Sequence, residues 1–137
     1  MSTSFGPQLI GETEKTLNAL LRRTLEPTGL TEPQWVTLRL AGQLDWGEDA
    51  EGLIVGLADR AHFTNATDLV GELNARGLLE GGRLSSSGRE LTSAVQTTIA
   101  EETALIWQNL PDADVKSTTR VLNEIITRAR LVLASPK

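Results

Sequence analysis

Apolar residues recur at helical spacing through most of this sequence, and polar or glycine-rich turns separate the stretches. The first stretch predicts a helix from about Pro7 to Glu26, with a broad leucine-rich face. Thr31 and Gln34 then have the spacing of a capping box, which predicts the start of a second helix. The apolar face of that helix consists of Trp35, Leu38, Ala41 and Leu44.

The centre of the chain, from Leu53 to Leu84, predicts a short helix, a turn and a second helix. Thr64 and Asn65 are both good N-cap residues for that second helix, and Gly77 is suited to end it. The apolar positions of the pair are Leu53, Ile54, Leu57, Ala58 and Ala61 in the first helix and Leu69, Val70 and Leu73 in the second.

A tight β-hairpin is expected directly after this helix pair. Gly81 and Gly82 separate two short segments, residues 78–80 and 83–85, and a two-glycine loop suits a primed hairpin turn. Two helices followed by a hairpin have the outline of a winged helix-turn-helix, a fold that places its second helix in the DNA major groove.

Long helices are predicted on both sides of this head. Ser87 and Glu90 have capping-box spacing, with Ser85 or Ser86 as alternative caps, and the helix that follows runs to about Asn109. A last helix runs from residue 112 or 114 to about Ala134. The expected fold class is therefore mainly α with a short β-hairpin. It forms one domain over residues 1–137, with a winged helix-turn-helix head at 31–87 and dimerisation helices at 7–30 and 88–137.

We expect the apolar terminal helices to pack together and to form the platform of a homodimer. Twofold symmetry is the commonest arrangement of oligomers. It would also present two copies of the second helix to successive major grooves, about 34 Å apart.

The charge of the chain argues against DNA as a partner. The net charge is −5, and residues 51–90 carry four basic and six acidic side chains. Phosphate contacts supply most non-specific affinity for DNA, so a basic surface is the usual requirement. The rest of the composition is globular, with no cysteine, no apolar run near the ~20 residues that cross a bilayer and no signal peptide. A cytoplasmic location is the corresponding expectation.

Catalytic chemistry is not indicated by any group of residues. His62 is the only histidine and has no neighbours with metal-ligand spacing, so neither a metal nor another cofactor is expected. The serines at 85–87 lack a nearby base and are explained by helix capping. We therefore predict that the protein is not an enzyme.

Three motifs resemble the multiple antibiotic resistance regulator (MarR) family of winged-helix transcription factors. They are LTEPQWVTL at 30–38, LVGELNARGLL at 69–79 and LSSSGREL at 84–91. They are similar to that family's second helix, to its recognition helix and to the segment that opens its long helix. The resemblance implies a homodimeric regulator, a repressor, that reads a pseudo-palindromic operator in double-stranded DNA and is relieved by a small aromatic ligand.

The resemblance also implies which residues contact DNA. The start of the recognition helix would face base edges, with the arginines around it on the phosphate backbone. The alternative for Thr64 and Asn65 is that they only cap their helix, and Asp68 would repel phosphates if it faced outwards. The implied DNA-binding residues are Thr64, Asn65, Thr67, Asp68, Arg60, Arg76 and Arg83.

The wing and the aromatic residues complete the expectations. The hairpin of this family is usually longer and carries an Asp-x-Arg motif, which is absent here, so Arg83 is the nearest basic residue. Trp35, Trp46 and Trp107 are candidates to line an aromatic ligand site, with core packing as the alternative for each. The simplest role for Trp46 is a plug over the core.

A second function is consistent with the same fold. A diverged winged-helix dimer that has lost DNA binding would act as a ligand-binding or protein-interaction module. The net acidity, the lack of Lys or Arg before Arg76 in the recognition helix and the short hairpin all favour it.

Overall fold

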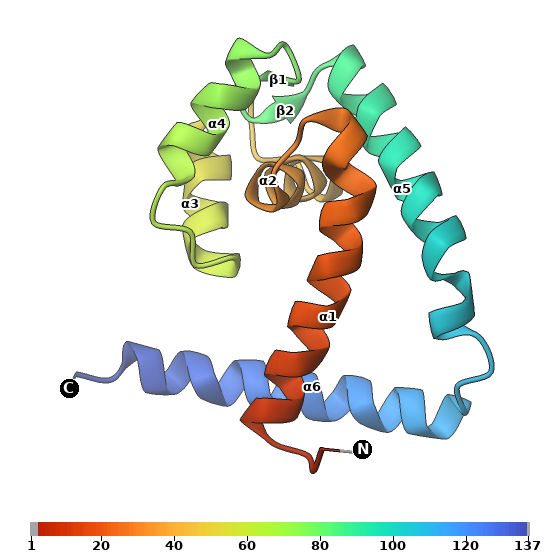
Figure 1. The fold of residues 1–137 in the computed structure, drawn as a ribbon. Helices are drawn as coiled ribbons and strands as arrows, with labels where there is room; N and C mark the ends of the chain where they lie inside the picture. The colour runs from red at the N-terminus through yellow and green to blue at the C-terminus, as the bar shows by residue number, and fades with distance from the viewer. Residues whose placement is uncertain (1–2, 137) are drawn as a thin grey trace. The chain divides into compact units, whose positions relative to one another are not determined.

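The computed structural model describes residues 3–136 as a mainly helical chain with one short hairpin (Figure 1). This confirms the predicted fold class. The elements, in order, are α1 (Pro7–Leu25), the 3-10 turn η1 (Glu26–Thr28), α2 (Glu32–Gln43), α3 (Glu51–Arg60), α4 (Ala66–Ala75), β1 (Leu79–Glu80), β2 (Arg83–Leu84), α5 (Ser86–Trp107) and α6 (Asp112–Ala134).

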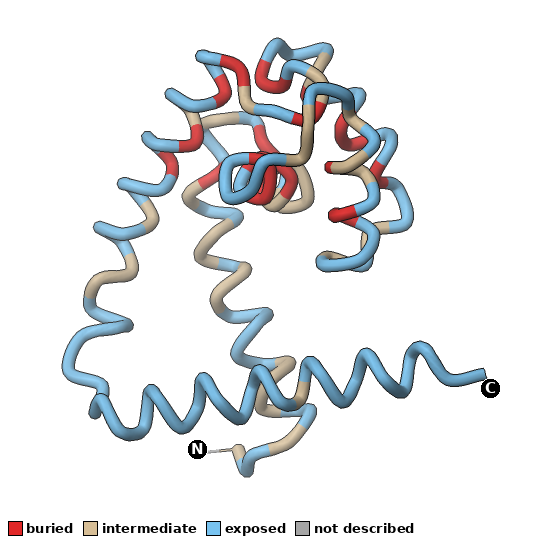
Figure 2. The backbone as a smooth tube through the Cα atoms, turned by 180° about the vertical axis from the view of Figure 1, so that it is seen from behind, coloured by how far each residue is buried: buried red, intermediate tan, exposed pale blue. Residues whose placement is uncertain are grey.

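The chain divides into two compact units, residues 1–101 and 102–137, and the boundary falls within α5. The first unit contains α1 to α4, the hairpin and most of α5. The second contains the end of α5 and all of α6. Buried residues are confined to the first unit, and none of residues 102–136 is buried (Figure 2).

Side-chain caps fix where two of the helices begin. The predicted capping box of α2 is confirmed, because Thr31 Oγ1 accepts from Gln34 N–H at 3.2 Å and Gln34 Oε1 accepts from Thr31 N–H at 3.1 Å. Helix α5 is capped by Ser85, one of the two alternatives to Ser87. The Ser85 hydroxyl accepts from Gly88 N–H at 3.0 Å and donates to the Gly77 carbonyl at 2.6 Å. The preferred pairing of Ser87 with Glu90 was therefore wrong.

Some predicted helix boundaries also shift by one or two residues. Helix α2 ends at Gln43, so Leu44 lies beyond it and is 45% exposed rather than part of its apolar face. Helix α5 ends at Trp107, because Asn109 takes a left-handed conformation with φ of 61°. Residues with positive φ cannot continue a right-handed helix.

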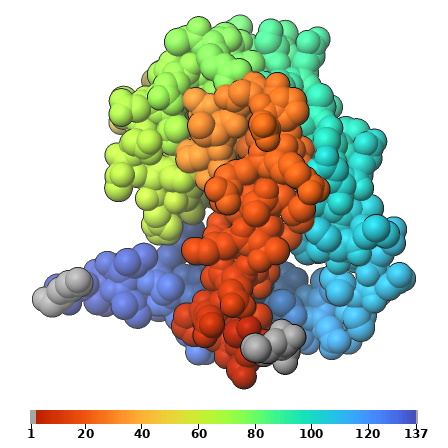
Figure 3. Space-filling model, in the orientation of Figure 1, coloured from red at the N-terminus to blue at the C-terminus, as the bar shows by residue number. Residues whose placement is uncertain are grey.

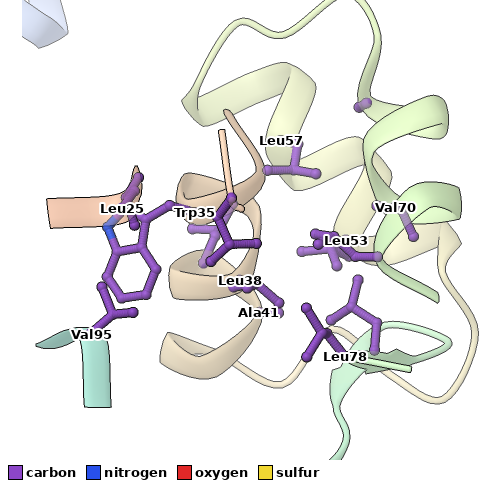
Figure 4. Close-up of a cluster of buried hydrophobic side chains, with 14 residues drawn as sticks. Leu25, Trp35, Leu38, Ala41, Leu53, Leu57, Val70, Leu78 and Val95 are labelled. Atoms are coloured by element: carbon purple, nitrogen blue, oxygen red, sulfur yellow. The ribbon is translucent and has the colours of Figure 1, made fainter. Parts of the chain in front are cut away.

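The core of the first unit is built from leucines of α1 to α4 around one tryptophan. Trp35 of α2 is 3% exposed and lies between Leu25 and Val95, whereas Leu53 and Val70 lie on the other side of α2 (Figure 4). Full burial of one such aliphatic side chain contributes roughly 1.5–3 kcal/mol. The fully buried side chains include Leu25, Leu38, Leu53, Leu57, Leu73 and Val70.

Trp46 closes the edge of this core, as predicted. Its indole Nε1 donates to the Leu40 carbonyl at 2.8 Å, and its ring packs against the core beside Gly56 of α3. The guanidinium of Arg60 lies 5.6 Å from the ring centroid, within range of a cation–π contact. Trp46 therefore links α2 to the middle and the C-terminal end of α3.

The hairpin has the predicted two-residue turn. Leu79 pairs with Leu84 and Glu80 with Arg83 in antiparallel register, which leaves Gly81 and Gly82 as the loop. Gly81 has φ of 62°, a left-handed conformation that glycine adopts without steric cost.

Gly56 offers a direct test of how Trp46 is seated. A Cβ at Gly56 would lie 2.5 and 2.6 Å from two ring atoms of Trp46. Gly56→Ala is expected to lower the free energy of unfolding by roughly 1–3 kcal/mol, the usual effect of overpacking. Gly71→Ala is the matched control, since nothing lies within 4 Å of that Cβ in α4. It should raise stability by up to about 1 kcal/mol, because alanine is the better helix former. Urea unfolding of both variants measures the difference. Equal free energies of unfolding for the two variants would contradict the packing of the Trp46 ring against Gly56.

Candidate nucleic-acid interface

Helix α4 buries one face and leaves the other open. Its buried residues are Ala66, Leu69, Val70 and Leu73, which pack on α2 and α3. Thr64, Asn65, Thr67 and Asp68, at the start of the helix, are all exposed. In Figure 3, atoms of the yellow-green to green segment that contains α4 lie at the surface of the first unit. The structure therefore brings together the four residues expected to face bases.

The turn before α4 is held by its backbone. Ala61 N–H donates to the Leu57 carbonyl at 3.0 Å, and Phe63 N–H donates to the same carbonyl at 3.4 Å. His62 between them has φ of 58°, a conformation uncommon for residues other than glycine. His62 itself is exposed, whereas Phe63 packs against the core. This turn fixes the direction in which α4 starts.

Asn65 occupies the N-cap position of α4, but its side chain makes no capping hydrogen bond. The expected capping role therefore does not hold for Asn65. An uncapped helix start leaves backbone N–H groups without intrahelical partners. Both these groups and the Asn65 amide are available to an external acceptor or donor.

The three arginines expected on the DNA backbone are exposed, yet each contacts its own protein. Arg60 lies over the Trp46 ring. Arg76 Nη2 donates to the Thr28 carbonyl at 3.2 Å, and Arg83 forms an ion pair with Asp45. All three guanidinium groups are therefore partly engaged, and Arg76, the C-cap residue of α4, lies at the opposite end of that helix from Asn65.

The acidic residues of α4 differ in their surroundings. Asp68 lies in the first turn of the helix and is exposed. Glu72 Oε1 accepts from Gln34 Nε2 at 3.3 Å, which directs this carboxylate toward the start of α2. The negative charge nearest the Thr64–Thr67 surface is therefore Asp68, and a carboxylate in a first helical turn is favoured by the helix dipole.

Asn74 holds the hairpin to α4, a role that sequence reasoning missed. Its Oδ1 accepts from Gly81 N–H at 3.2 Å, and its Nδ2 donates to the carbonyls of Gly81 at 3.4 Å and Val70 at 3.0 Å. Nothing in the sequence pairs Asn74 with a turn seven residues away. The hairpin turn and α4 are consequently joined by hydrogen bonds of the Asn74 side-chain amide.

The loop between α2 and α3 covers the other side of the hairpin turn. A Cβ on Gly82 would lie 2.5 Å from the Asp49 carbonyl oxygen, and Gly82 is buried. A Cβ on Gly81 would meet the Glu48 carbonyl. Glycine at these two positions therefore lets the backbone of the hairpin turn pack directly against the backbone of residues 48 and 49.

Asp45, in the same loop, is held as a carboxylate. Its Oδ1 accepts from Gly47 N–H at 3.0 Å, and Arg83 donates from Nε and Nη2 at 3.2 and 3.4 Å. The Gly47 N–H first, and then Arg83 through its hydrogen bond and its charge, hold the pKa of Asp45 below its ordinary value of 3.8.

The three tryptophans proposed for an aromatic site have different environments. Trp35 is almost fully buried and borders a hollow of about 220 Å³ between α1 and α2. Trp46 belongs to the core edge and is not among the residues that line this hollow. Trp107 lies in the second unit and is 57% exposed. The hollow is lined by Glu14, Leu17, Asn18, Leu21, Glu32, Trp35, Val36 and Arg39.

Residues 3–136 contain neither a metal-binding cluster nor a membrane-spanning helix. No three histidine or acidic side chains of this range gather in a way that could hold a metal ion. Within the same range, no helix combines the length and the apolarity needed to cross a membrane.

Helix α3, its turn, helix α4 and the hairpin together define a winged helix-turn-helix. No protein-family model and no curated protein matches the sequence. Solved structures do match the fold. The chain is 21% identical to CouR of Rhodococcus jostii RHA1 bound to p-coumaroyl-CoA, with a TM-score of 0.70 over 85% of this chain and 88% of that one.

The MarR family protein Rv2887 of Mycobacterium tuberculosis is similar as well. In its complex with DNA it is 22% identical, with a TM-score of 0.67 over 90% of this chain and 98% of that one. A MarR family regulator from Rhodococcus sp. RHA1 gives 21% identity and a TM-score of 0.67, over 85% of this chain and 90% of that one. The chain therefore has the fold of MarR proteins, as the sequence motifs predicted.

The titration of Asp45 tests the ion pair in the wing. Because the folded pKa is lowered, the charged carboxylate stabilises the fold at neutral pH, and this contribution is lost as the pH falls through that value. Arg83→Ala is expected to raise the pKa of Asp45 only part of the way to its ordinary value, since the hydrogen bond from Gly47 N–H, the largest single cause, remains. Carboxyl NMR shifts measured against pH would show this. A pKa of Asp45 unchanged by Arg83→Ala would contradict the ion pair.

Proposed function

We propose that this protein is a MarR-type transcriptional regulator that binds double-stranded DNA through the exposed start of α4. The observation that carries the proposal is the grouping of Thr64, Asn65, Thr67 and Asp68 at an uncapped helix start in a winged helix-turn-helix. The structure of Rv2887 in complex with DNA supports the same use of this fold.

The side chains at this helix start have the chemistry of base readout. An asparagine amide can bond to adenine N6 and N7 together, and threonine can contact a thymine methyl or a phosphate. The uncapped N–H groups at the start of α4 suit a backbone phosphate, because helix N-termini bind anions. Arg60, in the last turn of α3, is exposed, and so are Arg76 and Arg83, which lie toward the C-terminal end of α4.

A homodimer is part of the proposal. The second unit exposes many apolar side chains on α6 and the end of α5, and extensive apolar exposure of this kind is typical of an interaction site. A second copy of the chain is the partner we propose, because twofold symmetry pairs two reading helices with two half-sites. The exposed residues include Leu105, Trp107, Leu110, Val115, Val121, Leu122, Ile126, Leu131, Val132 and Leu133.

We further propose a repressor role, relieved by a small aromatic ligand at the hollow between α1 and α2. The hollow has apolar walls at Leu17, Leu21 and Val36 and a cation at Arg39. Rv2887 is solved with salicylic acid and with p-aminosalicylic acid, and CouR with p-coumaroyl-CoA. These ligands of structural neighbours support an aromatic ligand as the first class to try.

Selection from a random pool of duplex DNA, followed by fluorescence anisotropy on the recovered sequence, tests DNA binding. We expect two inverted half-sites about one helical turn apart. Asn65→Ala should weaken binding by at least roughly fivefold, the low end of 1–3 kcal/mol for a bidentate base contact. Gln96→Ala, on the exposed side of α5, is the control and should bind as wild type does.

Salicylate added to the complex should release the DNA if the hollow is the effector site.

Two results would contradict parts of this proposal. The first is failure to enrich any sequence, which would favour the rival function, a winged-helix dimer without DNA binding. The net charge of −5 and the internal contacts of Arg60, Arg76 and Arg83 are the observations that favour the rival. The second is binding that Asn65→Ala leaves unchanged, which would move the contact away from α4.

Sedimentation of the free protein tests the dimer. One chain has a mass of 14.8 kDa, so a twofold assembly should sediment at about twice that mass at micromolar concentration. Leu122→Glu and Ile126→Glu together should shift the protein toward the single chain, because charged residues are depleted at interface cores. A wild-type protein that sediments as one chain would rule the dimer out.

A further inference from the structure

The wing carries one cation, and that cation is already paired. Arg83 is the only Lys or Arg in the hairpin, residues 79–84. Its Nε and Nη2 donate to the two carboxylate oxygens of Asp45, at 3.2 and 3.4 Å. Two parallel N–H donations from guanidinium to an oxyanion are also the way arginine binds a phosphate. Asp45 thus occupies one of the two guanidinium edges through which Arg83 could bind a DNA phosphate.

Both members of this pair are fixed in place by other contacts. Asp45 Oδ1 also accepts from Gly47 N–H at 3.0 Å, so its loop holds the carboxylate. Asn74 bonds to both the N–H and the carbonyl of Gly81, which fixes the hairpin turn. A Cβ on Gly82 would lie 2.5 Å from the Asp49 carbonyl oxygen, so the hairpin turn packs closely on this loop.

The pair is nevertheless open to solvent. The side chain of Arg83 is 50% exposed and that of Asp45 is 73% exposed. Exposed ion pairs of this kind are weak, so the contact does not stabilise the fold strongly. Its stronger effect is on charge, because it neutralises Arg83 and leaves a carboxylate beside the place where a phosphate would approach. Both effects act within about 8–10 Å at ordinary salt.

We infer that Asp45 limits the affinity of this protein for DNA by holding Arg83 in an internal ion pair. This inference rests on the proposed function. It makes Asp45 a determinant of binding strength and of salt sensitivity, although Asp45 itself contacts no base. With Asp45 neutral, Arg83 would gain a phosphate contact and the local repulsion would disappear.

Asp45→Asn is a clean test because it removes the charge and retains the Oδ1 acceptor for Gly47 N–H. The matched control is Asp49→Asn. Asp49 lies in the same loop, is exposed and accepts from Glu51 N–H two residues on, at 3.2 Å, but no cation pairs with it within residues 3–136. The two variants have the same net charge and differ only in whether Arg83 is released.

Anisotropy on the selected duplex, and on a duplex of scrambled sequence, gives the expected pattern. At ~50 mM salt, Asp45→Asn should bind both duplexes roughly three- to tenfold more tightly than wild type does, with Asp49→Asn close to wild type. One extra phosphate contact steepens the salt dependence by about 0.9 in log–log slope, so the gain should shrink roughly threefold by ~200 mM salt.

Arg83→Ala completes a double-mutant cycle. In the wild-type background, where Arg83 is paired, this change should alter DNA affinity by less than about twofold. In the Asp45→Asn background it should remove the whole gain. Circular dichroism and urea unfolding of the variants check that each fold is intact, so that a loss of binding is not a loss of structure.

Several outcomes would overturn the inference, and they can be told apart. Equal binding by Asp45→Asn and Asp49→Asn would show that only net charge matters. An equal effect of Arg83→Ala in both backgrounds would show that Asp45 does not restrain Arg83. Either result, with wild type binding DNA, leaves the proposed function standing. No binding by wild type or by any variant would overturn the proposed function and this inference with it.

Discussion

The buried face of α4 is the constraint on which the rest of the structure depends. Leu69, Val70 and Leu73 pack on α2 and α3 with almost no exposure, which fixes the rotation of the helix about its axis. That rotation leaves Asn65 and Thr67 outside. Because one face of an amphipathic helix is buried, only residues on the opposite face can meet a partner.

The short hairpin packs against the rest of the first unit and does not project as a wing. Its turn is enclosed by Asn74 on one side and by the loop at 47–49 on the other, and its one cation pairs with Asp45. Such a turn stiffens the head. It adds little reach, so in the function that we propose α4 reads the DNA and the acidic surface of the chain limits the affinity.

Sequence alone gave the order and type of the elements, because helical periodicity, the Thr31 capping box and the Gly81-Gly82 turn are local signals. It also predicted the role of Trp46 as a plug. The contacts that decide the site were not predictable in this way. The pairs Arg83–Asp45 and Asn74–Gly81 join residues by packing rather than by pattern, and the choice of Ser85 as a cap depends on the neighbouring Gly77 carbonyl.

The central claim is that the start of α4, rather than the hairpin, meets DNA. Amide NMR spectra of the labelled protein, recorded while the selected duplex is added, test it most directly. We predict the largest shift changes at residues 64–68, with the Gly81 and Gly82 amides nearly unmoved. Changes concentrated at residues 81–84, with residues 64–68 unaffected, would contradict the account.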